Sequence, residues 1–227
     1  MKYVLYLFIC SPLFSQEIIE PEMTMVWEPV PEIVTPGNLY SPPSDAIVLF
    51  DGTDLSQWSS AATGEESQWI INDDRSMTVK KGSGIETKEE FGSVQLHIEW
   101  KTPKEIEGVG QGRGNSGIYL QKEYEIQILD SYENVTYSNG QASSVYKQSI
   151  PLVNASRPPG DWQIYDIIFN EPIYDDQGNR LKKGTFTVFH NGVLVQNNVE
   201  IQGTTEHTGK PRLRNIKTPK KLYLQDH

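Results

Sequence analysis

The sequence has very little cysteine and no excess of positive charge. Its single cysteine, Cys10, lies near the amino terminus, so the chain after residue 15 can form no disulfide. The net charge is -10 and the isoelectric point is about 4.9. Nucleic acids and anionic membranes bind cationic surfaces, and we therefore expect neither as a partner. A neutral small molecule is the better expectation, and the sequence does not define an oligomeric state.

Long hydrophobic runs are also absent. The apolar run Tyr3–Ile9 follows Met1-Lys2 and is too short to cross a bilayer, so we predict no membrane span. A positive start, a short apolar run and a small residue at Ser15 are typical of a secretory signal peptide. A lipid anchor on Cys10 is disfavoured because Phe8 and Ile9, which precede it, are not small. The pattern predicts a signal peptide over residues 1–15 and a secreted or periplasmic protein.

No window of eleven residues has a helical period, and short β-rich runs recur between turn residues instead. The clearest alternates apolar and polar residues over 94–100, and Asn191-Gly192 predicts a tight hairpin turn. Further strands are expected over 45–50, 69–71, 77–79, 162–169, 185–189, 193–195 and 221–224. This pattern predicts an all-β, two-sheet sandwich or jelly roll. The strand over 221–224 has no evident partner, so we expect the sheet to lack a last strand there.

Proline separates the chain into two parts. Six prolines fall between residues 21 and 43, a composition typical of an extended arm. We therefore predict a proline-rich arm over residues 16–44 and one β domain over residues 45–227.

One stretch concentrates the candidate chemistry. A glycine-rich segment over 112–117 leads into β-rich runs at 116–121 and 124–130, which predicts a hairpin. Strand alternation places Glu125 and Gln127 on one face and Tyr124 and Ile126 on the other. Two carboxylates at that separation would form a glycosidase pair, but Gln127 is an amide and Asp130 falls on the opposite parity. Ordinary two-carboxylate hydrolysis is therefore only partly supported, and a solvated Glu125 stays an alternative.

The other candidates are polar side chains near turns or glycines. His190 and His227 are candidate proton-transfer groups. Arg113 and Asn115 offer forked donors beside glycines, and Tyr146-Lys147 offers either a site cation or a surface lysine. No residues have metal-ligand spacing, so we expect no metal and no cofactor, although scattered oxygens leave a structural calcium open.

Several motifs taken together resemble the 3-keto-disaccharide hydrolase family. They lie at 49–58, 113–119, 124–131, 159–162, 190–193 and 224–227, and the resemblance extends over residues 45–227. It implies a concanavalin A-like jelly roll, secretion by a bacterium, and a carbohydrate substrate oxidised at C3. The family continues past the Leu-Gln-Asp-His motif at 224–227, which implies that a last strand is missing here.

The resemblance also implies a mechanism. A keto group at C3 acidifies the proton on C2, so one base can remove it while the group on C1 leaves by elimination, and water can then complete a net hydrolysis. The implied base is Glu125 or His190, and the implied acid is Asp130 or His227. The groups left to bind the sugar are Arg113, Asn115, Gln127, Tyr146 and Lys147. The alternatives are a non-catalytic carbohydrate-binding module and an ordinary two-carboxylate glycosidase.

Overall fold

The structure is a computed structural model that describes residues 20–38, 41–214 and 220–227. The chain divides into two compact units, Met1–Ile47 and Val48–His227. The signal peptide predicted over residues 1–15 lies outside the described residues. The described part of the first unit contains one short 3-10 helix, η1 (Pro21–Thr24), and is otherwise mostly extended and exposed. Within the described residues, no helix has the length and apolarity to cross a membrane.

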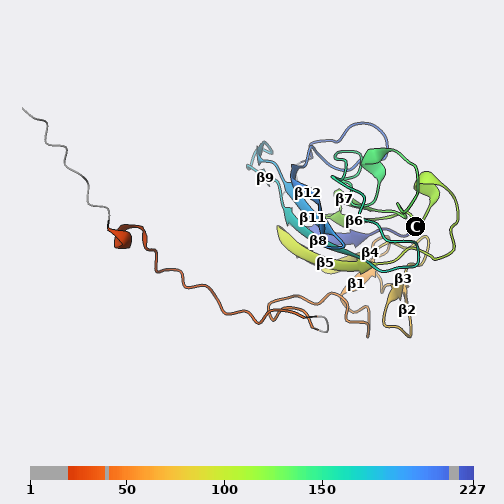
Figure 1. The fold of residues 1–227 in the computed structure, drawn as a ribbon, viewed down its shortest axis with the longest axis horizontal. Helices are drawn as coiled ribbons and strands as arrows, with labels where there is room; N and C mark the ends of the chain where they lie inside the picture. Colours follow the sequence, from red (N-terminus) through yellow and green to blue (C-terminus); the bar gives the residue numbers. More distant parts are fainter. Residues whose placement is uncertain (1–19, 39–40, 215–219) are drawn as a thin grey trace, which may run out of the picture. The chain divides into compact units, whose positions relative to one another are not determined.

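The second unit is a β-sandwich of two antiparallel sheets, as the sequence predicts (Figure 1). The five-stranded sheet has the order β1-β4-β13-β6-β7, and the four-stranded sheet has the order β12-β11-β8-β5. The strands of the first are β1 (Trp58–Ser60), β4 (Ile85–Phe91), β6 (Ser116–Leu120), β7 (Tyr124–Ile128) and β13 (Lys220–Leu224). Those of the second are β5 (Val94–Trp100), β8 (Gln163–Asn170), β11 (Thr185–His190) and β12 (Val193–Glu200).

Strand alternation produces the core between the two sheets. On β8 and β11 every second side chain is buried, including Tyr165, Ile167, Phe186 and Val188. Ile126 of β7 belongs to the same apolar cluster. Burying an aliphatic or aromatic side chain of this size stabilises the fold by roughly 1.5–3 kcal/mol. The core therefore sets the register of both sheets and fixes which β7 residues face away from it.

The carboxyl-terminal strand corrects one expectation. The run over 221–224 is not an unpaired edge, because β13 lies between β4 and β6 and pairs with both. Its partners all lie more than a hundred residues earlier in the chain, and local sequence patterns carry no information about such distant pairing.

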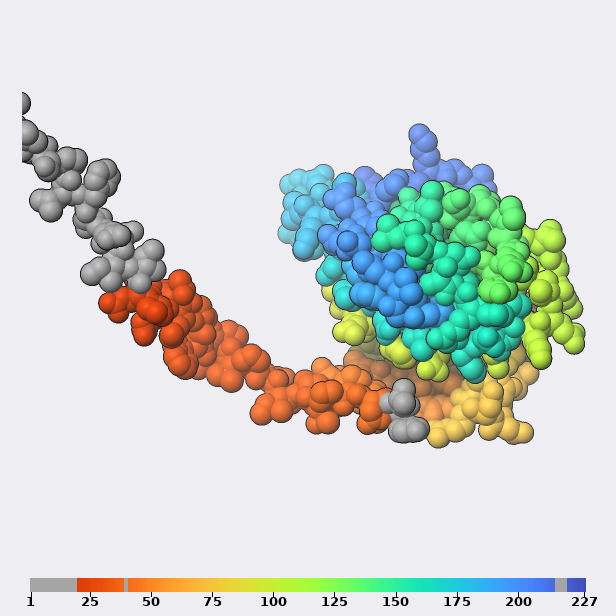
Figure 2. Space-filling model, viewed as in Figure 1, coloured from red at the N-terminus to blue at the C-terminus, as the bar shows by residue number. Residues whose placement is uncertain are grey.

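The expected strand over residues 45–50 is wrong. No strand is assigned between residues 42 and 57, and the carbonyl oxygen of Leu49 accepts a hydrogen bond of 2.7 Å from Nε1 of Trp58 instead. The other predicted strands are present, including the hairpin of β2 (Ile70–Ile71) and β3 (Met77–Thr78). A small hairpin of β9 (Ile173–Tyr174) and β10 (Arg180–Lys182) projects from the edge of the domain (Figure 2). The only other helices in the described residues are two 3-10 turns, η2 (Gly110–Gly112) and η3 (Ser138–Gly140).

Candidate active site

The β6–β7 hairpin carries the site. Its turn contains Gln121 and Lys122, both with positive φ angles of 54° and 59°, so two non-glycine residues adopt the left-handed conformation that reverses the chain. The resulting register places Tyr119 directly opposite Glu125 and Gly117 opposite Gln127. The predicted common face of Glu125 and Gln127 is confirmed, because Tyr124 and Ile126 point into the core.

Gly117 leaves the space that this face needs. A Cβ atom at this position would lie 2.5 Å from Oε1 of Glu125, 3.0 Å from the ring of Tyr119 and 3.1 Å from Oε1 of Gln225. The first of these distances is far below van der Waals contact. Three polar side chains from β6, β7 and the segment after β13 therefore meet above one glycine.

Glu125 is a buried carboxyl group with an unusual proton affinity. Its side chain is 3% exposed, and Oε2 has no hydrogen-bond partner within the described part of the chain. Burial raises the pKa of Glu125 to about 7, while a hydrogen bond from Tyr119 and the charge of Lys147 act in the opposite direction. A carboxyl group with this pKa exchanges protons readily near neutral pH.

Lys147 and two tyrosines form one side of the site. Lys147 has a φ of 57°, and its ammonium group lies 5.3 Å from the ring centre of Tyr146 and 5.7 Å from that of Tyr137. It also donates a hydrogen bond to the carbonyl oxygen of His207. The Tyr137 and Tyr146 hydroxyl groups are hydrogen-bonded to each other at 2.7 Å. These contacts hold a cation where its charge acts on Glu125.

A hydrogen-bonded chain of amide side chains lies beneath Glu125. Nε2 of Gln127 donates to Oε1 of Gln111 and to Oδ1 of Asn115, both at 3.1 Å. The amide nitrogens of Gln111 and Asn115 donate in turn to the carbonyl oxygens of Gly140 and Gln111, both at 2.9 Å. Gln127 is 1% exposed, so this chain lies beneath the site and not on its surface.

A cavity of about 510 Å³ opens beside the site. The rings of Tyr119 and Tyr223 in its wall lie 5.4 Å apart. Small residues make room for them, since a Cβ atom on Gly84 would lie 2.5 Å from the hydroxyl oxygen of Tyr223. The lining residues are Ala61, Ala62, Gly82, Gly84, Tyr119, Lys122, Tyr223, Gln225 and Asp226. This volume, lined by two aromatic rings, the amide group of Gln225 and two charged side chains, is suited to a ligand of the size of a sugar.

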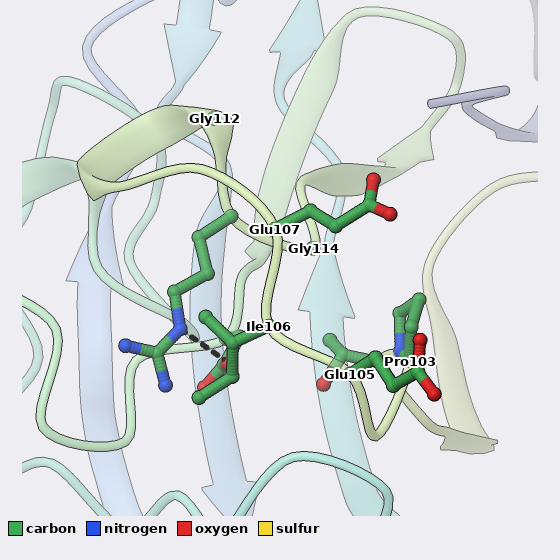
Figure 3. Close-up of a pocket in the computed structure, with 9 residues that line it drawn as sticks. Pro103, Glu105, Ile106, Glu107, Gly112 and Gly114 are labelled. Carbon is green, nitrogen blue, oxygen red and sulfur yellow. Dashed lines mark hydrogen bonds and ion pairs between the residues drawn. The ribbon is translucent and has the colours of Figure 1, made fainter.

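Asp130 and Arg113 lie elsewhere. Oδ2 of Asp130 accepts a hydrogen bond of 2.6 Å from Nε of Arg113, and Nη2 of Arg113 donates to the carbonyl oxygen of Tyr132. Both side chains are buried and line a separate cavity of about 300 Å³. Glu105 and Glu107 extend from the segment that covers this cavity (Figure 3). The contacts of this pair hold the chain around β7 and do not join Asp130 to Glu125.

His190 is also separated from Glu125. It points into the core, where its ring lies 4.8 Å from that of Tyr165 and 5.8 Å from that of Trp100. Its Nε2 is 3.1 Å from Oε1 of Gln163, and burial lowers its pKa to about 4. The expectation that a turn histidine reaches the site is corrected here, because the alternation of β11 directs His190 inward, away from the face that carries Glu125.

His227 lies nearer the site. It follows Asp226, which lines the larger cavity, and its Nδ1 is 3.8 Å from Oδ1 of Asp226. The structure thus gathers Glu125, Gln127, Asn115, Tyr146 and Lys147 around one face. It leaves Arg113, Asp130 and His190 outside that group.

Sequence reasoning missed Tyr119, Tyr223, Gln225 and Gln111. The hairpin register contains enough information to pair Tyr119 with Glu125. Tyr223 and Gln225 reach the site only because β13 lies beside β6, which no local pattern indicates. In the described residues, no group of three or more histidine, cysteine, aspartate or glutamate side chains could hold a metal ion.

Comparison with solved structures finds a near relative. A crystal structure of a proposed glycosyl hydrolase from Parabacteroides distasonis has 48% sequence identity and a TM-score of 0.87, and the match covers 92% of this chain and 90% of that one. A second proposed glycosyl hydrolase from the same organism has 22% identity and a TM-score of 0.56, with 80% and 87% covered, and shares the fold.

No match is found among curated proteins. The model of one protein family, the 3-keto-alpha-glucoside-1,2-lyase-like domain, matches residues 45–227, which is most of the chain and includes every residue of the site. The motifs that carry the resemblance in the sequence all lie within this range. The chain belongs to the family of the 3-keto-alpha-glucoside-1,2-lyase-like domain.

Proposed function

We propose that this protein cleaves glycosides whose sugar ring carries a keto group at C3, and that Glu125 is the proton-transfer group. The observation that carries this proposal is a single buried carboxyl group with a pKa of about 7, facing a cation and a tyrosine hydroxyl group. The family match and the glycosyl hydrolase relative at 48% identity support a glycoside as the substrate.

The chemistry needs one base and a stabilised oxygen. The C3 carbonyl makes the C2 proton acidic, and the carboxylate of Glu125 takes that proton to give an enolate. The electron pair of the enolate then re-forms the carbonyl and makes a C1–C2 double bond, while the bond from C1 to the glycosidic oxygen breaks. Addition of water to C1 and return of a proton to C2 complete a net hydrolysis.

The remaining side chains have roles that follow from their charge and position. Lys147 is a fixed cation near Glu125 and stabilises the enolate oxygen. Tyr119 donates a hydrogen bond at the same carboxyl group, and the ring of Tyr223 packs against that of Tyr119 at an angle of 59° in the wall of the larger cavity. Asp226 lines the larger cavity and His227 lies beside it, and we assign protonation of the leaving oxygen to one of these two groups. None of these steps needs an oxidant or a reductant.

Ordinary two-carboxylate hydrolysis has less support. The partner that the sequence offered, Asp130, is engaged with Arg113 in the separate cavity. A carbohydrate-binding module would not need a buried carboxyl group whose ionisation is costly, because hydrogen bonds to sugar hydroxyl groups can come from neutral side chains.

One experiment separates these functions. The full chain is incubated with a 3-keto-glucoside and, in parallel, with the same glucoside unoxidised, and the released sugars are measured. We expect cleavage of the keto compound only, and loss of about a thousandfold or more of that activity in Glu125→Gln. Cleavage of the unoxidised glucoside would indicate an ordinary glycosidase, and binding without cleavage would indicate a binding module.

A further inference from the structure

The amide group of Gln127 lies between two opposed pairs of oxygen atoms. On one side are Oε1 of Gln111 and Oδ1 of Asn115, both 3.1 Å away. On the other side are Oε1 of Glu125 at 2.9 Å and the carbonyl oxygen of Ser116 at 3.2 Å. The amide nitrogen can serve only one pair, and the amide oxygen must face the other.

Backbone carbonyl groups decide which side the nitrogen serves. Gln111 and Asn115 direct their own amide nitrogens to the carbonyl oxygens of Gly140 and Gln111. A carbonyl oxygen can only accept, so neither amide can turn over without placing two oxygens against each other. Gln111 and Asn115 therefore present two acceptor oxygens to Gln127, whereas the other side has one fixed acceptor, the carbonyl oxygen of Ser116, and a carboxyl group that can carry a proton. The nitrogen of Gln127 points toward the two acceptors.

The oxygen of Gln127 consequently faces Oε1 of Glu125. Two oxygens at 2.9 Å repel when the carboxyl group is ionised, and they form a hydrogen bond when it carries a proton. If Gln127 turned over it would gain the carboxylate and Ser116 as acceptors and would lose Gln111 and Asn115. The orientation of one buried amide and the protonation of Glu125 are thus coupled.

We propose that Gln111 and Asn115, acting through Gln127, favour the protonated form of Glu125 and so make its carboxylate a stronger base. Both are positioning residues, since neither touches Glu125 directly. The titratable groups facing Glu125 from neighbouring elements are Tyr119, Tyr146, Lys147 and Tyr223. The positive charge of Lys147 favours the ionised carboxylate of Glu125, so it cannot be what favours the protonated form. The inference extends the proposed function, on which its consequence for catalysis rests.

Two substitutions of Gln111 test the proposal, because they should affect the titration midpoint of Glu125 differently. Gln111→Met removes one of the two acceptors and leaves Asn115 alone on that side, so Gln127 can turn toward Glu125 and Ser116 and stabilise the carboxylate. We expect the titration midpoint of Glu125 to fall by about one pH unit. Gln111→Glu keeps an acceptor oxygen facing Gln127 and adds a negative charge, so the midpoint should stay or rise. A merely structural role of this loop would move both variants the same way.

The measurement does not depend on turnover. The carboxylic acid C=O band of Glu125, assigned by its loss in Glu125→Gln, is followed by infrared difference spectroscopy against pH without substrate. Gln141→Met, which removes another amide of the same region that does not contact Gln127, is the matched control and should leave the midpoint unchanged. Where activity on a 3-keto-glucoside is found, the acidic limb of its kcat/KM profile should shift with the infrared midpoint.

The proposal is overturned if Gln111→Met titrates like the native protein or if Gln111→Met and Gln111→Glu both shift downward. Should Gln111→Met fail to fold, Asn115→Leu removes the other acceptor and is expected to give the same downward shift. Failure of the proposed function would appear differently, as an unchanged infrared result with no cleavage of the keto substrate.

Discussion

At the scale of single residues, Glu125 combines the proton affinity that the proposed chemistry needs with a cost in stability. Its carboxyl group is buried, and its pKa is raised from 4.5 to about 7. A group whose pKa is higher in the folded state stabilises the fold below its unfolded pKa, and this contribution is lost as the pH rises through the folded pKa. Ionised Glu125 therefore destabilises the protein above neutral pH.

Glu125→Gln should consequently be inactive but more stable than the native protein. We expect the difference in unfolding free energy to be small near pH 4 and to reach about 2–3 kcal/mol at pH 8. Urea unfolding at several pH values measures it. Glu90→Gln, at an exposed position of β4, is the control and should show no such trend. A native protein as stable as Glu125→Gln at pH 8 would contradict the cost assigned to this carboxylate.

Arg113 and Asp130 should matter for stability and little for catalysis. Arg113→Met leaves a buried carboxylate without its ionic partner, which should destabilise the fold by about 3–5 kcal/mol. In the double variant with Asp130→Leu the loss should be smaller, because no charge is left unpaired. Thermal unfolding and kcat/KM measured well below the unfolding temperature distinguish the two roles. A fall in kcat/KM without a fall in stability would indicate that Arg113 and Asp130 take part in catalysis or substrate binding.

At the scale of the β6–β7 hairpin, Gly117 is needed because the side chains of Tyr119, Glu125 and Gln225 occupy the space that its Cβ atom would take. Its own backbone conformation does not require glycine. Gly117→Ala would place a methyl group 2.5 Å from Oε1 of Glu125, so we expect a fall in kcat of about a hundredfold or more, with the fold retained. Gly112→Ala is the matched control, because a Cβ atom there meets no atom within 4 Å. Kinetics and circular dichroism of both variants test this. Native-like kinetics in Gly117→Ala would mean that Glu125 does not act from its observed position.

The elements also show how far sequence reasoning extends. Alternation on one strand was sufficient to place Glu125 and Gln127 together, because side-chain direction along a strand depends only on parity. The same rule also indicates the direction of His190, because His190 shares its parity with the buried Phe186 and Val188. The expectation for His190 rested on its position beside a turn instead, which does not determine the direction of a side chain. Asp130 lies beyond the end of β7, where alternation no longer holds. The partnership of Tyr223 with Tyr119 depends on contacts between distant segments and could not be predicted locally.

At the scale of the whole domain, two buried groups give the stability opposite dependences on pH. Burial lowers the pKa of His190 from 6.5 to about 4, so the folded state resists a proton that the unfolded chain accepts. Stability due to neutral His190 is fully present above pH 6.5 and is lost as the pH falls toward 4. Glu125 acts in the reverse direction over an overlapping range.

We therefore expect the native unfolding free energy to change little between about pH 4.5 and 6.5, because the two contributions offset each other. His190→Phe should remove one of them, so that its stability rises steadily as the pH falls over this range. Urea unfolding at closely spaced pH values gives both curves. If the curve for His190→Phe ran parallel to the native one, the titration of His190 would not contribute to stability.

The position of β13 has a consequence for how the domain comes into being. Within the five-stranded sheet, β1 and β4 form one group and β6 and β7 another, and only β13 joins them. A ribosome releases residues 220–224 long after the strands on either side of them. Until then the strands of the two groups do not pair with each other, and the Lys122–Glu86 ion pair is a side-chain contact only. Closing the sheet requires contacts between segments more than a hundred residues apart. Contacts of this range slow folding. The domain should therefore close late in folding, and the wall that Tyr119 and Tyr223 share forms only when β13 is inserted between the two groups.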